Sequence, residues 1–421
     1  MTGPRVHRLA NGATLICDPV SGFETLALSV VAGRGARWED EARSGWSHLL
    51  EHMVFKGAGG RTARQIVEAI EAEGGQINAA TGQERTSFQV RALAGGLPLA
   101  MEVTADLVRS PTLDPDDLAK EVQVIGQEIA EAADTPDDLV FELAQAAAFA
   151  GQPLGRPILG VVPTISAAEP ASLEGWRAGL YAPDRLVISV AGAVDADEFL
   201  RLAEAAFGDA SEEGAAAPAE GAFRGGRAAH SRKLEQAHLV FLLPAPGVRD
   251  ADHWALRLFA EMLGGGMSSR LFQEARERLG LAYAIDAWVE AYADVGVLGI
   301  YAGCAAKDAA QLAEVAASEI LDLAESPGVG ELARAKAQLK ASLFMGRESL
   351  AARAEMAAAQ QLAFGRLLEP AEMARAIDAV SQADLARLAR RLLDPSQCAV
   401  SALGPKAAMG APAKFGDTLF G

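Results

Sequence analysis

Residues 165–192 read ISAAEPASLEGWRAGLYAPDRLVISVAG, and residues 377–404 read IDAVSQADLARLARRLLDPSQCAVSALG. The two segments align without gaps at an offset of 212 residues, and each is typical of a helix, a proline turn and then a strand. The identities in this one register include Ile165, Leu173, Pro183, Ser189 and Gly192, which recur as Ile377, Leu385, Pro395, Ser401 and Gly404. The agreement indicates that the two halves of the chain arose by duplication.

The clearest segment without apolar periodicity is 208–232, GDASEEGAAAPAEGAFRGGRAAHSR. Its richness in Gly, Ala, Pro and charged residues is typical of a linker. A chain of 421 residues is also too long for one ordinary core. We therefore predict two related α+β domains, at 1–207 and 233–421, joined by this linker.

Local patterns place several elements of the first half. Residues 27–32 predict a strand, and residues 46–56 predict a helix that ends at Gly57, a favourable residue for a helix C-terminus. Thr62 and Gln65 have the spacing of a capping box, which predicts that another helix begins there. Strands mixed with helices in this way favour an α+β domain.

Two further elements follow in the first half. Phe88, Val90 and Ala92 alternate with polar residues, which predicts a strand with one buried face. Asp114-Pro115 then has the pattern of an N-cap followed by a first helical residue. The helix that we expect there has an apolar stripe made by Leu118, Val122, Ile125 and Ile129.

Composition excludes some classes of protein. The chain has 38 Lys and Arg against 56 Asp and Glu, a formal net charge of −18, so a nucleic-acid-binding protein with a basic surface is not expected. Its three cysteines are odd in number and form no CxxC pair, which favours a reducing compartment. No apolar run reaches 18 residues, and the N-terminus lacks the apolar region of a signal peptide. We expect a cytoplasmic protein without membrane or nucleic-acid partners.

The segment His-Leu-Leu-Glu-His at residues 48–52 carries the clearest chemistry. On a helix, His48 and His52 share one face because they are four residues apart, so both can bind one metal ion. Imidazole nitrogens suit zinc, and the adjacent Glu51 carboxylate could accept a proton from an attacking water. A plain helix with two surface histidines is the alternative, but two of only six histidines fall in this motif.

A catalytic zinc usually has three protein ligands and one open position. Glu128 and Glu121 both lie on the helix expected after Asp114, and seven residues bring the two carboxylates to nearly the same face. One could bind the metal while the other orients a histidine. A solvated acidic face would have the same spacing, and spacing alone does not choose between the two carboxylates.

Several stretches together resemble the pitrilysin, or insulinase, family of inverted-zincin peptidases. HLLEH is followed by MVFKGAGGRTA, and the other similar stretches are GGQINAATGQERTSF (74–88), EVQVIGQEI (121–129), GQPLGRPILG (151–160) and SSRLFQEARERLGLAY (268–283). The branch that the chain resembles contains the mitochondrial processing peptidase beta subunit and its bacterial relatives. The resemblance implies two α/β-roll domains of the pitrilysin type.

This resemblance assigns roles that spacing leaves open. It implies that Glu128 is the third zinc ligand and that Glu121 is the supporting acid. It also implies that Arg276 and Tyr283 donate hydrogen bonds to the scissile carbonyl, a role that suits a guanidinium and a phenol. The stretch 74–88 resembles the substrate-docking edge strand of the family, so Asn78 and Ala79 would pair with the substrate backbone.

The resemblance further implies an assembly. Larger members of the family enclose a chamber with four such domains, so a chain with two domains would complete it as a dimer. A homodimer is expected because this one chain contains both the HxxEH motif and the stretch with Arg276 and Tyr283. A heterodimer stays open as the alternative. The predicted function is hydrolysis of unfolded peptides by a zinc endopeptidase.

A non-catalytic scaffold or complex subunit of the same family is the alternative. An altered HxxEH motif or a missing third ligand would favour it, and both are intact here. The second half differs in this respect. The positions 212 residues after His48, Glu51, His52 and Glu128 are occupied by Ala260, Leu263, Gly264 and Lys340. The first half is therefore predicted to be catalytic and the second supportive. Neither the natural substrate nor the identity of the divalent metal follows from the sequence.

Overall fold

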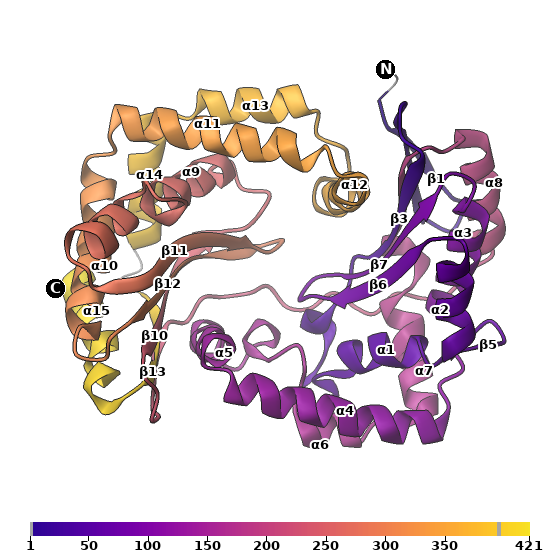
Figure 1. Cartoon of the computed structure of the whole chain (residues 1–421), viewed down its shortest axis with the longest axis horizontal. Coiled ribbons are helices and arrows are strands. Elements are labelled where there is room, and N and C mark those ends of the chain that lie inside the picture. The colour runs from indigo at the N-terminus through magenta and orange to yellow at the C-terminus, as the bar shows by residue number, and fades with distance from the viewer. Residues whose placement is uncertain (1–2, 394–396) are drawn as a thin grey trace. The chain divides into compact units, whose positions relative to one another are not determined.

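The computed structural model describes residues 3–393 and 397–421. The chain divides into two compact units, the first made of Met1–Ala130, Pro157–Pro218 and Met345–Leu367, the second of Glu131–Arg156, Ala219–Phe344 and Leu368–Gly421. Each unit combines a sheet with helices (Figure 1), which confirms the predicted α+β fold class. Over the described ranges, no helix is both long enough and apolar enough to cross a bilayer.

A six-stranded mixed sheet forms the centre of the first unit. Its order is β1 (Arg5–Arg8), β2 (Thr14–Pro19), β8 (Leu186–Gly192), β3 (Thr25–Ala32), β7 (Thr86–Leu93) and β6 (Gln76–Thr81). The helices are α1 (Trp46–Val54), α2 (Ala63–Ala72), α3 (Leu97–Arg109), most of α4 (Pro115–Asp134), α6 (Val162–Ser166), α7 (Pro170–Leu180), α8 (Ala196–Phe207) and α12 (Leu350–Phe364). A short hairpin, β4 (Gly57–Ala58) with β5 (Arg61–Thr62), links α1 to α2.

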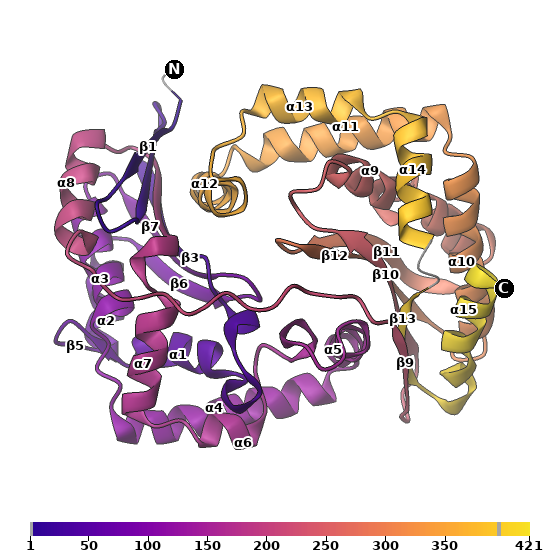
Figure 2. The ribbon, with the colours of Figure 1, turned by 180° about the vertical axis from the view of Figure 1, so that it is seen from behind.

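The second unit has a five-stranded sheet in the order β11 (Ala282–Ala291), β12 (Val295–Cys304), β10 (Ala237–Pro246), β13 (Ala399–Gly404) and β9 (Gly226–Ser231). Its α-helices are α5 (Pro136–Ala148), α9 (His253–Gly264), α10 (Ala309–Glu325), α11 (Val329–Gly346), α13 (Pro370–Ala379), α14 (Gln382–Leu393) and α15 (Ala411–Phe420). A π-helical segment covers Phe272–Arg278. Figure 2 shows α10 and α15 on one side of this sheet and α5 on the other.

The two sheets confirm the predicted duplication. Strands β2-β8-β3-β7-β6 and β9-β13-β10-β12-β11 have the same pattern, in which only the first pair of each series is parallel. Gly192 and Gly404 end equivalent strands with φ of +119° and +150°. A Cβ atom at Gly192 would lie 2.4 Å from the Thr25 carbonyl oxygen, and one at Gly404 would lie 2.8 Å from the Cα of Ala237. Both positions therefore require glycine, which explains its recurrence in the repeat.

Each sheet is covered on one face by a helix from the other half of the sequence. Helix α12 packs its Leu350, Ala354 and Ala358 against the sheet of the first unit, on the face opposite α3 and α8 (Figure 1). Helix α5 packs in the same way on β10 and β13. The packing of α12 on the first sheet and of α5 on the second is favourable because it removes the second face of each sheet from water. The compact units therefore differ from the predicted domains 1–207 and 233–421 by the segments 131–156 and 345–367.

Two local expectations need correction. Helix α1 ends at Val54 instead of residue 56, because its last turn tightens into bonds from Phe55 N to His52 O and from Lys56 N to Met53 O. Gly57 then enters β4 instead of terminating the helix. The predicted linker 208–232 is also shorter, since its last part forms β9, and residues 210–225 have no helix or strand. The other elements expected in the first half occur, including the capping box at Thr62.

Candidate metal centre

Helix α1 is fixed at its N-terminus by a buried carboxylate. The two Glu39 oxygens accept hydrogen bonds from the backbone N–H groups of Gly45, at 2.8 Å, and Ser47, at 2.7 Å. Gly45 has φ of +92°, and Gly160 approaches it so closely that a Cβ at Gly160 would lie 2.5 Å from the Gly45 Cα. The start of α1 is therefore held in place by both contacts.

The amphipathic sequence of α1 decides which side chains remain accessible. Leu49, Leu50, Met53 and Val54 are completely buried in the core of the first unit. The opposite face presents His48 and His52, whose side chains are 14% and 20% exposed. The spacing of four residues thus places both imidazoles on one face, as predicted.

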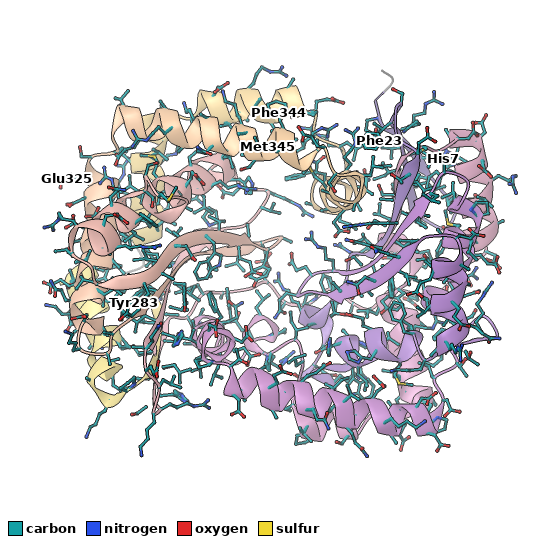
Figure 3. All side chains as sticks on the ribbon, viewed as in Figure 1. His7, Phe23, Tyr283, Glu325, Phe344 and Met345 are labelled. Atoms are coloured by element: carbon teal, nitrogen blue, oxygen red, sulfur yellow. The ribbon has the colours of Figure 1, made fainter. Side chains whose placement is uncertain are left out.

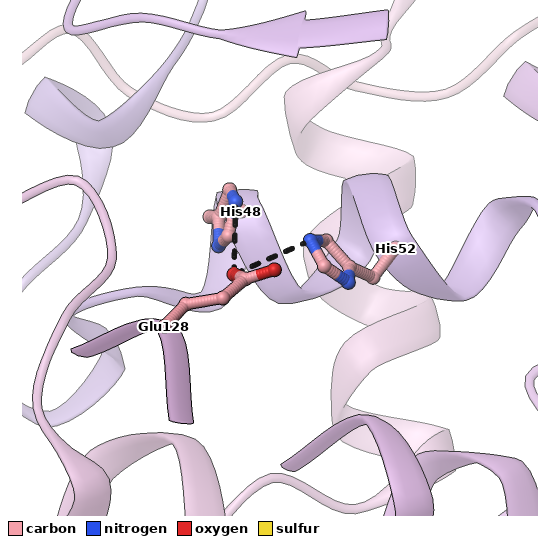
Figure 4. A group of neighbouring side chains, drawn as sticks. All are labelled: His48, His52 and Glu128. Carbon is pink, nitrogen blue, oxygen red and sulfur yellow. Dashed lines mark ion pairs between the residues drawn. The ribbon is translucent and has the colours of Figure 1, made fainter. Parts of the chain in front are cut away.

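Glu128 of α4 completes a group that could hold a metal ion. Its Oε2 lies 3.7 Å from His52 Nε2 and 4.0 Å from His48 Nε2, and Figure 4 shows its carboxylate facing both rings. Ligand atoms of a tetrahedral zinc ion are about 3.3 Å apart, so a small contraction around an ion would satisfy the geometry. In the part of the chain that the structure describes, this is the only such group of three.

The protonation of His48 favours metal binding. Burial, and to a smaller extent the neighbouring His52, lowers the pKa of His48 to about 4. The imidazole is therefore neutral near pH 7 and has a lone pair to offer. The two rings are 4.6 Å apart between centroids and meet edge to face. Because His48 is neutral, this close pair does not place two positive charges side by side.

Glu121 occupies a different environment from Glu128. Its side chain is 7% exposed, whereas that of Glu128 is 37% exposed. One Glu121 oxygen lies 3.0 Å from His52 Nδ1, and the other lies 2.7 Å from the Nζ atom of Lys56. Glu121 therefore contacts Nδ1 of His52, whereas Glu128 faces Nε2 of the same ring, the nitrogen that is free to bind a metal.

Glu51 lies between the two histidines in sequence but does not belong to the metal group. One of its carboxylate oxygens is buried and has no hydrogen-bond partner among the described residues. The hydroxyl of Tyr181, directly after α7, is also buried without such a partner. Burial, and then the charge of Glu51, raises the pKa of Tyr181, so the phenol stays neutral. The Glu51 carboxylate thus keeps an acceptor site open.

The edge of the sheet adjoins this centre. Strand β6 contacts α1 and pairs only with β7 among the described strands, with Asn78 opposite Gln89 and Ala79 opposite Phe88. A cavity of about 570 Å³ lies beside it, and its lining includes Phe55, Val67 and Ile77. The predicted substrate-docking residues therefore lie on an available strand edge next to a cavity whose lining is both apolar and polar, since Glu71 and Arg91 also face it.

Arg276 and Tyr283 belong to the second unit. Arg276 lies in the π-helical segment, where its guanidinium carbon is 4.7 Å from the centre of the Phe272 ring. Tyr283 lies on the edge strand β11 and is 62% exposed (Figure 3). The metal group belongs to the first unit, so the catalytic role of this pair stays a prediction.

Two residues near the centre were not identified from the sequence. Lys56 follows His52 by four residues, and that spacing is the one sequence signal that could have pointed to it. Tyr181 follows a helix without any distinguishing pattern. In the second unit, α9 has Ala260, Leu263 and Gly264 at the offset of 212, and all three are buried.

Sequence and structure comparisons identify the family. The pattern described as "Insulinase (Peptidase family M16)" matches residues 18–161, and that described as "Peptidase M16 inactive domain" matches residues 168–339. A Rickettsia bellii protein named "Uncharacterized zinc protease" is 35% identical over 95% of this chain and 97% of its own length. The zinc protease YmxG of Bacillus subtilis is 34% identical over 91% of this chain and 94% of its own.

Solved structures share the fold. A protease from Helicobacter pylori, 21% identical, superimposes with a TM-score of 0.89 over 96% of this chain and 99% of its own. An M16 protein from Pseudomonas fluorescens, described as an inactive domain and 19% identical, gives the same TM-score over the same shares. With the sequence matches over both halves, these findings establish that the chain belongs to the insulinase, or pitrilysin, family of metallopeptidases, M16.

Proposed function

We propose that this protein is a zinc-dependent endopeptidase that hydrolyses unfolded peptides. The observation that carries the proposal is the convergence of His48, His52 and Glu128, with Glu51 on the same helix as the two histidines. The zinc protease names of the relatives support zinc as the metal. An intact metal group favours this proposal over a non-catalytic scaffold.

The proposed mechanism divides the work between the metal ligands and Glu51. His48, His52 and Glu128 would hold zinc, which when bound lowers the pKa of an attacking water and polarises a carbonyl. Glu51 accepts the proton of that water as its oxygen attacks the scissile carbonyl carbon, and returns the proton to the departing amine. Its unpaired oxygen suits this transfer.

Substrate binding would use the open edge of β6. An extended peptide could continue the sheet through main-chain hydrogen bonds with Asn78 and Ala79. A side chain of the same peptide could enter the adjacent cavity of about 570 Å³. Recognition through the backbone explains why the proposed substrates are unfolded, since folded chains seldom offer a free strand.

The remaining parts of the proposal rest on the family resemblance. Arg276 and Tyr283 would donate hydrogen bonds to the scissile carbonyl from a partner subunit, in a dimer that encloses both active sites. A homodimer is proposed because one chain carries both motifs, and a heterodimer is the alternative. Relationship to the mitochondrial processing peptidase branch and location in the cytoplasm also stay predictions.

Removal of the metal should abolish activity. We expect a chelator such as 1,10-phenanthroline to stop cleavage of a quenched fluorescent peptide library, and stoichiometric zinc to restore it, because water activation depends on the metal. A non-chelating phenanthroline isomer serves as the control. Undiminished cleavage by metal-free protein, confirmed by elemental analysis, would exclude the zinc mechanism, and no cleavage by zinc-loaded protein would favour the scaffold.

The two acidic residues of α4 should differ in their effect on metal affinity. Glu128→Gln removes an anionic ligand, whereas Glu121→Gln weakens only the support of His52, a change that typically costs about 10–100-fold. We therefore expect the larger loss of zinc affinity for Glu128→Gln in competitive chelator titrations. Glu131→Gln, an exposed position on the same helix, is the matched control. The reverse order for the first two variants would exchange their assigned roles.

A further inference from the structure

We propose that Lys56 is a positioning residue of the metal centre, which holds the Glu121 carboxylate in the orientation that fixes the His52 imidazole. The inference rests on the proposed zinc site but not on peptidase activity. It assigns a function to the lysine in the MVFKG stretch, which lies outside the metal-binding motif itself.

The contacts form a linear chain from lysine to histidine. Lys56 Nζ lies 2.7 Å from Oε1 of Glu121, and Oε2 of the same carboxylate lies 3.0 Å from His52 Nδ1. Each oxygen therefore has its own partner, so rotation of the carboxylate would break both contacts. Glu121 is 7% exposed at its side chain, and a carboxylate so far from water needs such charge-assisted hydrogen bonds.

This arrangement decides which nitrogen of His52 is available. A carboxylate only accepts hydrogen bonds, so in the 3.0 Å contact His52 Nδ1 is the donor, and Nε2 is left for the metal. His48 has no equivalent support, since its buried Nδ1 lacks a hydrogen-bond partner within the described chain. The orientation of His52 therefore depends on Glu121, and that of Glu121 on Lys56.

Charge balance supports the same role. The carboxylates of Glu121 and Glu128 contact the histidines, and Glu51 adds a third in the residue before His52. A divalent cation balances only two of these three negative charges. The ammonium group of Lys56 supplies the missing positive charge. Because its side chain is 35% exposed, the lysine does so without complete loss of its own hydration.

The first test measures zinc affinity of purified, metal-free variants by competitive chelator titration. We expect Lys56→Met to weaken zinc binding by about 10-fold, near the lower end of the effect of outer partners of metal ligands. Lys56→Arg should recover most of this loss, because a guanidinium can also donate to Glu121. Lys120→Met is the matched control, since Lys120 is 70% exposed and pairs with Asp117 instead. Zinc binding by Lys56→Met equal to that of Lys120→Met would overturn the proposal.

A double variant separates positioning from a general effect of charge. If Lys56 acts through Glu121, then Lys56→Met combined with Glu121→Gln should bind zinc no more weakly than Glu121→Gln alone. Additive losses of zinc affinity in the double variant would refute the proposal that Lys56 acts through Glu121. Failure of the unaltered protein to bind zinc would refute it as well. Peptide cleavage is not part of either measurement, so an inactive but zinc-binding protein would contradict the proposed function and leave this inference standing.

Discussion

Glu51→Gln is expected to abolish peptide hydrolysis while zinc remains bound. Loss of general-base catalysis typically lowers turnover by about 10²–10⁴-fold, because the amide cannot accept the proton of the attacking water. The metal should be retained because His48, His52 and Glu128 are all unchanged, and Glu51 does not belong to their group.

The surroundings of Glu51 make this substitution informative. One of its oxygens is buried without a hydrogen-bond partner among the described residues, so an isosteric amide disrupts no existing side-chain contact of that atom. The nearby Tyr181 stays neutral and offers a hydroxyl in either case. Loss of activity would therefore reflect the missing proton acceptor and not a collapse of the site.

Two measurements on the same preparation test the role of Glu51. Elemental analysis gives the zinc content, and cleavage of a quenched peptide gives the turnover. Glu102→Gln is the matched control, because Glu102 lies on α3 with its side chain 60% exposed and pairs with Arg61. If zinc is lost together with activity, or if turnover survives, Glu51 is not the general base of an assembled zinc site.

Local sequence patterns were sufficient to predict the features that depend on interactions between residues close together in the chain. The face shared by His48 and His52 follows from helical periodicity, and the start of α2 follows from the capping box of Thr62 and Gln65. Gly192 was recognisable as part of a repeat, and its positive φ gives the physical reason for that recurrence. These features involve residues within a few positions of one another, or a pattern that occurs twice.

Features that depend on distant contacts could not be predicted in this way. Strand β9 has almost no buried residue, because it pairs with β13 on one side only, so its sequence shows no apolar alternation. The attachment of α5 and α12 to the sheets depends on burial against strands far away in the sequence. Spacing likewise could not separate Glu121 from Glu128, whereas their exposed fractions of 7% and 37% distinguish them at once.

Mixing two inactive variants is expected to restore activity if the active enzyme is a dimer with sites built from both chains. Glu51→Gln lacks the general base, and Tyr283→Phe lacks a hydroxyl whose loss typically costs about 10²–10³-fold when it stabilises an oxyanion. In a mixed dimer, one metal centre has an intact Glu51 and receives an intact Tyr283 from the other chain.

Action between chains is expected from the family resemblance. In the four-domain relatives, the zinc domain comes first, and the Arg–Tyr pair lies in the last domain. Division of that architecture into two equal chains places the pair on the partner. The exposed position of Tyr283 on an edge strand is compatible with such a contact, and a two-fold dimer would contain two equivalent sites.

The expected recovery has a definite size. With complete exchange at equal amounts, half of the dimers are mixed and each has one functional site, so activity should approach about one quarter of that of the unaltered protein. Exchange itself is followed with differently tagged chains, and each variant alone under the same treatment is the control. Activity near zero despite proven exchange would mean that Tyr283 serves the metal centre of its own chain or has no catalytic role. Recovery would instead require that a single chain is incomplete, because neither variant contains both groups.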